Sequence, residues 1–371
     1  MVSLASGYGN FAVPAAAMEA ALAVLADAQR PGKPLEVSPA AGLPELREAL
    51  AQRYRQRGAA SVSAAQVIVT SGAKTGLFAI LSELLAPGGD VLMPTPNWFG
   101  FWELVRRTGS TLRTLPLAAA DDYALAPKAL RAALTPDTKM LIISNPNNPT
   151  GRVYSRAEWE AVLAVTAEFP QLWVLSDEIY EGINFGPEPV PTLLSFPDPH
   201  QRHVVVSGFS KSLALAGWGV GCAVVPPALS PAVVARLFGT GVAVPVPAQA
   251  AALAATRQAD AVAGALCAQL AGNRRLLLDG LAALPGAAVS PIPGGTYYVF
   301  ADFTRFLDPQ LPAAAASAQL VQQLAAAGLV VVDGATCGAP GFARLSYAVP
   351  AADLARAVTI LQQMLAPLAV R

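Results

Sequence analysis

Lys211 is the residue whose position most strongly suggests chemistry. It ends the segment Ser207–Lys211, which follows a predicted buried strand at His203–Ser207. A lysine that attacks a carbonyl carbon must be partly desolvated, because only its neutral amine is a nucleophile. The end of a buried strand meets that requirement. The alternative is a surface lysine whose stem covers apolar groups, which is the more common fate of a single lysine.

A carboxylate follows the preceding predicted strand, Leu172–Ser176. Asp177 lies in the segment Ser176–Tyr180, directly after that strand. A buried carboxylate is costly unless it is paired, and a protonated pyridine nitrogen would be such a partner. A structural salt bridge or a helix cap is the alternative interpretation.

Two further segments could bind a phosphate and a planar ring. Ser71–Lys74 follows the predicted strand Val67–Thr70 and opens a helix, so free backbone N–H groups and the helix dipole favour an anion there. An ordinary helix N-cap looks the same. Trp98, after Pro94–Asn97, could stack on a planar cofactor, although a packing aromatic is the simpler interpretation.

The string Asn-Pro-Asn-Asn-Pro-Thr-Gly at Asn145–Gly151 is the most distinctive in the chain. Its two prolines and its glycine fix a tight turn at a strand end, where a rigid asparagine can donate to a ligand oxygen. Arg344 lies in the predicted strand Ala343–Ala348. Its planar guanidinium can clamp a carboxylate through two parallel hydrogen bonds, and an edge-strand charge is the alternative.

The elements that position these residues alternate between strands and helices up to about Ala248. Several strand candidates are continuous apolar runs, which is typical of a sheet covered on both faces. We therefore expect an α/β fold with a doubly wound, mostly parallel sheet, whose ligand sites lie at the carboxyl ends of the strands. The predicted strands are Val67–Thr70, Asp90–Met93, Lys139–Ser144, Leu172–Ser176, His203–Ser207 and Gly219–Val225.

From about Ala248 the pattern changes, and we expect a smaller α+β domain. A long helical stretch runs to about Leu284, and the helical segment Phe11–Ala28 should pack with this domain because it cannot bury its apolar face alone. The predicted domains are a large cofactor-binding domain at 30–250 and a small domain formed by 1–29 and 251–371. Within the small domain, the predicted strands are Thr296–Asp302, Leu329–Val332 and Ala343–Ala348, and the predicted helices are Ala314–Ala327 and Ala351–Leu365.

Composition excludes several classes of protein. The 371 residues are 54% hydrophobic and 13% charged with zero net charge, so a large core is available and an attraction to nucleic acid or anionic membranes is not expected. No charge-free apolar run is long enough to span a bilayer. The three cysteines are far apart and no secretory signal is visible, which indicates a reducing cytoplasm. His200 and His203 have no cluster of co-ligands, so no metal site is expected.

Taken in this order and spacing, the chemical segments resemble the fold-type I, class I/II pyridoxal-phosphate-dependent aminotransferases. The resemblance covers nearly the whole chain, from Gly7 to the last helix. The strings that are specific to this family are Asn145–Gly151, Ser176–Tyr180, Gly208–Lys211 and Ala343–Tyr347.

The resemblance implies a role for each site residue. Lys211, Asp177 and Tyr180 would be catalytic: Lys211 would bind pyridoxal 5′-phosphate as an imine and shuttle the proton, and Asp177 would pair with the pyridine nitrogen. Tyr180 and Asn148 would donate to the phenolic oxygen of the cofactor. The implied cofactor-binding set is Ser71, Gly72, Ala73, Lys74, Trp98, Asn148, Asp177, Tyr180, Ser210 and Lys211. The implied substrate-binding set is Gly7, Asn148 and Arg344, with Arg344 holding the α-carboxylate.

Three residues that bind the cofactor phosphate in this family are missing here. Gly219 replaces the family arginine, and Val37 stands nearest to a tyrosine that the partner subunit usually supplies. Gly241 stands where a serine or threonine usually precedes Gln249. Losing a buried guanidinium–phosphate pair costs about 1.5–3 kcal/mol. We therefore expect looser cofactor binding, or a substitute cation such as Lys74.

The implied reaction is transfer of an α-amino group from an L-amino acid to a 2-oxo acid in a cytoplasmic homodimer. A lyase, cyclase or oxidase on the same scaffold would use the same cofactor and carboxylate groups, and a non-catalytic ligand-binding homologue is a further alternative. The residues near the motifs that we expect to line the side-chain pocket are Tyr8, Phe11, Asn97, Trp98 and Phe99. Four of these five residues are aromatic, which favours neutral or aromatic amino acids as substrates.

Overall fold

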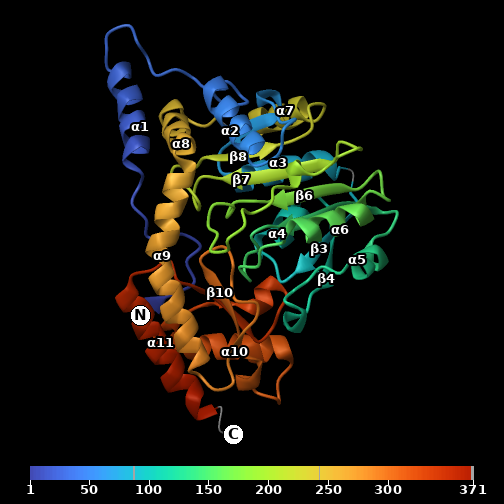
Figure 1. Ribbon diagram of the computed structural model, residues 1–371, viewed down its shortest axis with the longest axis vertical. Coiled ribbons are helices and arrows are strands. Elements are labelled where there is room, and N and C mark those ends of the chain that lie inside the picture. The colour runs from blue at the N-terminus through green and yellow to red at the C-terminus, as the bar shows by residue number, and fades with distance from the viewer. Residues whose placement is uncertain (87, 242, 369–371) are drawn as a thin grey trace.

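A seven-stranded sheet forms the centre of the larger part of the molecule (Figure 1). We describe a computed structural model, which covers residues 1–86, 88–241 and 243–368. Strand β8 runs antiparallel to both of its neighbours and the other neighbours pair in parallel, which confirms the predicted α/β class. In spatial order the strands are β2 (Val67–Thr70), β8 (Gly221–Val224), β7 (His203–Gly208), β6 (Trp173–Asp177), β5 (Thr138–Ser144), β3 (Asp90–Thr95) and β4 (Thr111–Pro116).

Helices cover both faces of this sheet, so its central strands are apolar on both sides. In β5, Leu141 and Ile143 belong to the core on one face, whereas Met140 and Ile142 belong to the core on the other. This period of two follows from the pleat of a strand. The first face is covered by α2 (Pro44–Gln56), α5 (Pro127–Ala133), α6 (Arg156–Thr166) and α8 (Val246–Arg257), and the second by α3 (Ala73–Leu84), α4 (Gly100–Arg107) and α7 (Ser230–Thr240).

The smaller part has its own sheet and its own core. Four strands pair in the antiparallel order β12–β13–β10–β9, and a parallel pair joins β1 to β11. The strands are β1 (Val2–Ser3), β9 (Ala288–Val289), β10 (Tyr298–Asp302), β11 (Leu329–Val330), β12 (Val332–Asp333) and β13 (Phe342–Ser346), and the helices are α9 (Ala259–Ala282), α10 (Ala313–Ala326) and α11 (Ala351–Leu365).

The N-terminal segment divides between the two parts. Val2 and Leu4 belong to the core of the smaller part. Helix α1 (Ala15–Ala28), by contrast, lies along α8 (Figure 1), and its buried residues Ala17 and Ala21 join a core of the larger sheet. This packing differs from the expectation that the whole segment packs with the small domain. Small alanine side chains allow the two helices to approach closely. The boundaries at 30–250 stay a prediction.

Other differences are local. The long predicted helix after Ala248 is interrupted at Gln258, which separates α8 from α9. Strand β8 begins at Gly221 rather than Gly219, because Gly219 adopts a left-handed φ of 67° in the preceding turn. The edge strand β4 was not predicted from its alternating, partly exposed residues. Within the described chain, no helix is long and apolar enough to cross a bilayer.

Candidate active site

One cavity of about 620 Å³ lies at the carboxyl ends of the central strands and reaches the smaller sheet. Segments after β2, β5, β6 and β7 supply one side, and β13 and the N-terminal segment supply the other. The structure brings every predicted cofactor- and substrate-binding residue to this cavity. They are Gly7, Ser71, Gly72, Ala73, Lys74, Trp98, Asn148, Asp177, Tyr180, Ser210, Lys211 and Arg344.

Lys211 is buried, which excludes the surface-lysine alternative. Its Nζ donates to the carbonyl oxygen of Gly7 and lies 3.8 Å from the centre of the Tyr8 ring. Burial lowers the pKa of Lys211 to about 7; the charge of Arg344 adds to this, and Asp177 opposes it. A substantial fraction of the amine is therefore neutral near pH 7, as a nucleophilic lysine requires.

Asp177 ends β6 and is also buried. One carboxylate oxygen accepts a hydrogen bond from the backbone N–H of Ile179 at 3.2 Å. Burial raises the pKa of Asp177 to about 6, and the neighbouring Glu178 adds to the shift. A carboxylate in this setting gains most from a cationic N–H partner inside the cavity. A protonated pyridine ring fits that need.

Tyr180 packs edge to face with two further tyrosines, Tyr297 and Tyr298, which were not predicted from the sequence. Its hydroxyl lies 2.7 Å from that of Tyr298, which also lines the cavity and donates to the Gly7 carbonyl at 3.4 Å. Tyr297 donates to the same carbonyl at 2.8 Å. In the sequence, Tyr297 and Tyr298 follow the glycine pair Gly294–Gly295 at the start of a strand. Such a pattern does not by itself indicate a functional site.

Arg344 lies on β13 between β12 and β10, so the edge-strand alternative does not apply. It is only 3% exposed. Its Nη1 donates to Oδ1 of Asn148 at 3.0 Å and its Nη2 to the carbonyl of Ala5 at 3.0 Å. The guanidinium stands 4.2 Å from the centre of the Tyr298 ring. Its Nε is buried and has no hydrogen-bond partner in the described chain, which fits a site for an anionic group.

The predicted phosphate end of the cavity has room for a missing side chain. Ser71–Lys74 begins helix α3, and Gly72 has a left-handed φ of 78°. Gly219 lines the same cavity, and a Cβ built there would meet no atom within 4 Å. Lys74 is exposed and lies 5.5 Å from the centre of the Trp98 ring. The ammonium group of Lys74 is therefore available close to the Trp98 ring, although the family arginine is replaced by Gly219.

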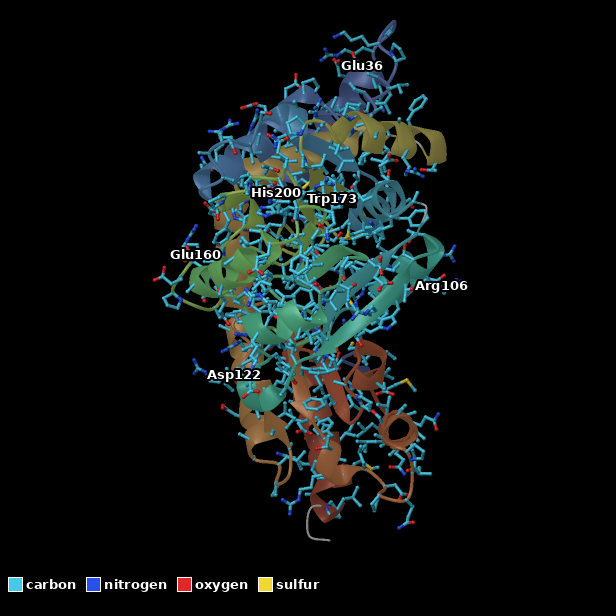
Figure 2. The ribbon with its side chains drawn as sticks, turned by 90° about the vertical axis from the view of Figure 1, so that its right-hand side faces the viewer. Glu36, Arg106, Asp122, Glu160, Trp173 and His200 are labelled. Atoms are coloured by element: carbon cyan, nitrogen blue, oxygen red, sulfur yellow. The ribbon has the colours of Figure 1, made fainter. Side chains whose placement is uncertain are left out.

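The other two replaced positions lie outside the cavity. Val37 is 88% exposed in the loop between α1 and α2, whose position Figure 2 marks by the adjacent residue Glu36. Gly241 follows α7.

The aromatic lining is smaller than expected. Tyr8, Trp98 and Phe99 line the cavity. Phe11 instead packs against Tyr297, with ring centres 6.0 Å apart. Asn97 is buried beside the cavity without lining it, and its Oδ1 accepts a hydrogen bond from the Ser144 hydroxyl. These two positions follow the local path of the chain, which sequence spacing does not specify.

Comparison with known proteins decides the family. The family described as Aminotransferase class I and II matches residues 1–361. The chain belongs to this family. It is therefore a pyridoxal-phosphate-dependent aminotransferase, which confirms the predicted enzyme class and cofactor.

This aminotransferase is similar to the following relatives over nearly its whole length. It is 33% identical to an aspartate/prephenate aminotransferase of Thermus thermophilus, over 96% of this chain and 89% of the relative. It is 32% identical to a probable aspartate/prephenate aminotransferase of Thermus aquaticus, over 98% of this chain and 91% of the relative. A solved structure of the Thermus thermophilus aspartate aminotransferase with maleate has a TM-score of 0.89, at 31% identity, and covers 98% of this chain and 92% of that chain.

Proposed function

We propose that this aminotransferase moves the α-amino group of an L-amino acid with a neutral or aromatic side chain to a 2-oxo acid. The observation that carries the proposal is the convergence of Lys211, Asp177 and Arg344 on one cavity. An amine with a lowered pKa, a buried acid and a guanidinium with a free donor are the groups that this reaction needs.

Each group has a separate task. The bound cofactor supplies an electron-withdrawing ring that stabilises charge at the substrate Cα. Asp177 keeps the ring nitrogen protonated through its negative charge. Lys211, once free, accepts and returns the Cα proton as a general base and acid. Arg344 binds the substrate carboxylate and so decides which Cα bond is presented for cleavage.

The preference for neutral or aromatic donors rests on the rings of Tyr8, Trp98 and Phe99, which line the cavity. One observation favours a second candidate, an acidic donor such as aspartate. Lys74 places a cation above Trp98, where it could bind a second carboxylate, and the relatives in Thermus carry aspartate and prephenate in their names.

A screen of single amino donors tests both the reaction and its substrate. The purified protein, loaded with pyridoxal phosphate, is mixed with one amino acid at a time, and loss of the visible cofactor band and formation of pyridoxamine phosphate are followed. We expect tyrosine, phenylalanine and neutral donors to react faster than aspartate and glutamate. A strong preference for aspartate would reject the first candidate, and release of ammonia with pyruvate in place of pyridoxamine phosphate would reject transamination.

Lys211→Ala tests the catalytic assignment in the same experiment. Removing the acid–base group should slow the half-reaction by about 10²–10⁴-fold. Turnover by this variant at the wild-type rate would rule out Lys211 as the catalytic lysine.

We also propose that the enzyme is a cytoplasmic homodimer. Helix α1 carries the exposed side chains Met18, Leu22 and Leu25 on one stripe, and the exposed Val37 follows in the next loop. Such a patch is unusual on a monomer and fits a subunit interface. Light scattering of the wild type should give twice the chain mass, and Leu22→Glu should weaken the dimer. A monomeric wild type at micromolar concentration would contradict this proposal.

A further inference from the structure

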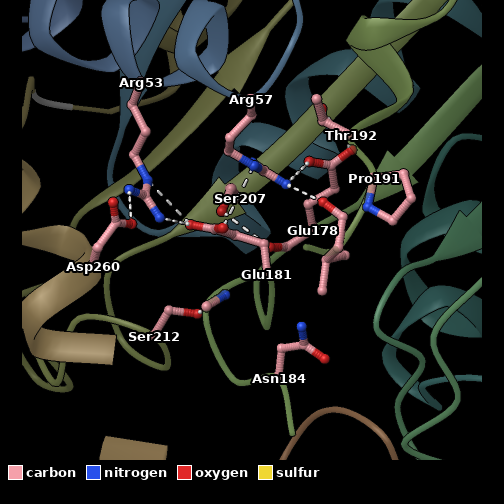
Figure 3. Close-up of polar contacts among 12 residues, drawn as sticks. Arg53, Arg57, Glu178, Glu181, Asn184, Pro191, Thr192, Ser207, Ser212 and Asp260 are labelled. Atoms are coloured by element: carbon pink, nitrogen blue, oxygen red, sulfur yellow. Dashed lines mark hydrogen bonds and ion pairs between the residues drawn. The ribbon is translucent and has the colours of Figure 1, made fainter. Parts of the chain in front are cut away.

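A partly buried ion network lies against the segment that carries Asp177 and Tyr180, and Figure 3 shows the residues that form it. Arg53 and Arg57 reach it from the end of α2, one helical turn apart. We call this set the arginine–glutamate network. Its members are Arg53, Arg57, Glu178, Glu181 and Asp260.

The segment 177–181 presents two kinds of side chain in opposite directions. Asp177 and Tyr180 line the cavity, whereas Glu178 and Glu181 contact the arginines (Figure 3). The backbone that positions the cofactor groups is therefore the same backbone that the network holds. Because Glu178 directly follows Asp177 in the chain, a backbone shift at Glu178 acts on Asp177 as well.

Glu178 is the glutamate next to Asp177, and it is 0% exposed. Its Oε1 accepts from Thr192 Oγ1 at 3.0 Å and from the Leu193 N–H at 2.9 Å. Its Oε2 lies 3.4 Å from Nη2 of Arg57. Burial raises the pKa of Glu178, and Arg57 opposes that rise. Within the described residues, Arg57 is the cation that forms an ion pair with this carboxylate.

Arg57 and Arg53 tie the segment to the surrounding helices. Arg57 also contacts Glu181, with Nε and Oε2 3.7 Å apart, and donates to the Val190 carbonyl at 3.4 Å. Arg53 links Glu181 at 2.9 Å to Asp260 of α9 at 2.9 Å. Both arginines that contact the segment therefore come from the end of α2, and Asp260 of α9 pairs with Arg53.

We propose that Arg57 is a positioning residue of the active site, which holds Glu178 and thereby fixes Asp177 and Tyr180 against the bound cofactor. A buried charge pair of this kind adds little net stability over an apolar pair. The Arg57–Glu178 pair instead fixes the geometry of the chain at the end of β6. The inference rests on the cofactor roles of Asp177 and Tyr180 in the proposed function.

The experiment compares four variants of the full-length protein: Arg57→Met, Arg57→Lys, Arg57→Met/Glu178→Gln and the control Arg55→Met. Arg55 lies on the same helix, and its ion-pair partner is the exposed Glu48. The measurements are the dissociation constant of pyridoxal phosphate, the visible circular dichroism of the bound cofactor, kcat and KM, and thermal stability.

We expect Arg57→Met to weaken cofactor binding by about tenfold or more, a size typical of residues that hold ligand-binding groups from behind. Its kcat should fall while KM for the amino donor stays within about twofold, because Arg344 is untouched. The cofactor dichroism should change. Arg57→Lys should retain most of the affinity, and Arg55→Met should match the wild type.

The double variant separates positioning from simple charge compensation. Because it leaves no unpaired charge on Glu178, its stability should recover towards wild type while its cofactor affinity stays low. Recovery of both together would overturn the proposal, as would equal affinities for Arg57→Met and Arg55→Met. If Arg57→Met does not fold, the double variant alone is compared with the wild type: low cofactor affinity at near-normal stability supports the proposal, and normal affinity overturns it. A wild type that binds no cofactor would instead reject the proposed function itself.

Discussion

Arg344 and Asn148 are joined by a hydrogen bond of 3.0 Å, although 196 positions separate them in the chain. The contact connects β13, one of the two central strands of the small antiparallel sheet, to the turn after β5 of the large sheet. Arg344 is thus oriented before any substrate arrives, which lowers the entropy lost when a carboxylate binds.

Arg344→Lys should raise KM for the amino donor by about 10–100-fold, since lysine cannot make two parallel hydrogen bonds to a carboxylate. The affinity for pyridoxal phosphate should change little. Steady-state kinetics and a cofactor titration measure the two effects. Arg356→Lys, at an exposed ion pair with Asp353, is the control, and an unchanged KM in Arg344→Lys would refute the assigned role.

Lys211 makes the stability of the cofactor-free protein depend on pH. Its pKa falls from 10.5 in the unfolded chain to about 7 in the folded one, so between these values the unfolded state binds more protons. Stability should therefore rise as pH increases from 7 to 10, as far as this group contributes. Asp177, with its pKa raised to about 6, completes its titration below this window.

Lys211→Met removes that contribution. The cofactor-free variant should be more stable than the wild type near pH 7 by roughly 1–4 kcal/mol, and the difference should shrink towards pH 10. Denaturant unfolding at several pH values measures both. If Lys211→Met were less stable than the wild type at pH 7, the expected loss of folding free energy from burying the Lys211 amine would be contradicted.

Lys74→Ala tests the substitute for the missing guanidinium. If Lys74 binds the cofactor phosphate, the dissociation constant of pyridoxal phosphate should rise by about tenfold, as for loss of one charge-assisted hydrogen bond. Lys139→Ala, at an exposed position of β5, is the control. A change confined to KM for aspartate would instead assign Lys74 to the substrate.

Tyr298→Phe removes the hydroxyl that contacts Tyr180 and keeps the ring beneath Arg344. We expect kcat to fall by about 3–10-fold, because Tyr180 loses a buried hydrogen-bond partner worth about 1 kcal/mol. The cofactor absorption maximum should shift, since the Tyr180 hydroxyl is then free to reorient. Tyr123→Phe removes a buried hydroxyl that has no partner in the described chain and should leave both values unchanged.

Local pattern was enough to predict the sheet and much of the site. Continuous apolar runs such as Val204–Val206 are typical of strands covered on both faces, and motif residues that follow parallel strands meet at one edge. For that reason the sequence predicts that Asp177 and Lys211 lie at the same edge of the sheet. The edge strand Thr111–Pro116 was missed because it has no continuous apolar run.

The sequence by itself determined which groups are available: an amine, an acid and a rigid asparagine in segments that end or follow strands, and a guanidinium within a strand. Only the tertiary structure decided their neighbours. The contacts of Tyr298 with Tyr180 and of Arg57 with Glu178 join segments more than a hundred residues apart. Such contacts depend on how two sheets and a helix pack, and no local spacing encodes that arrangement.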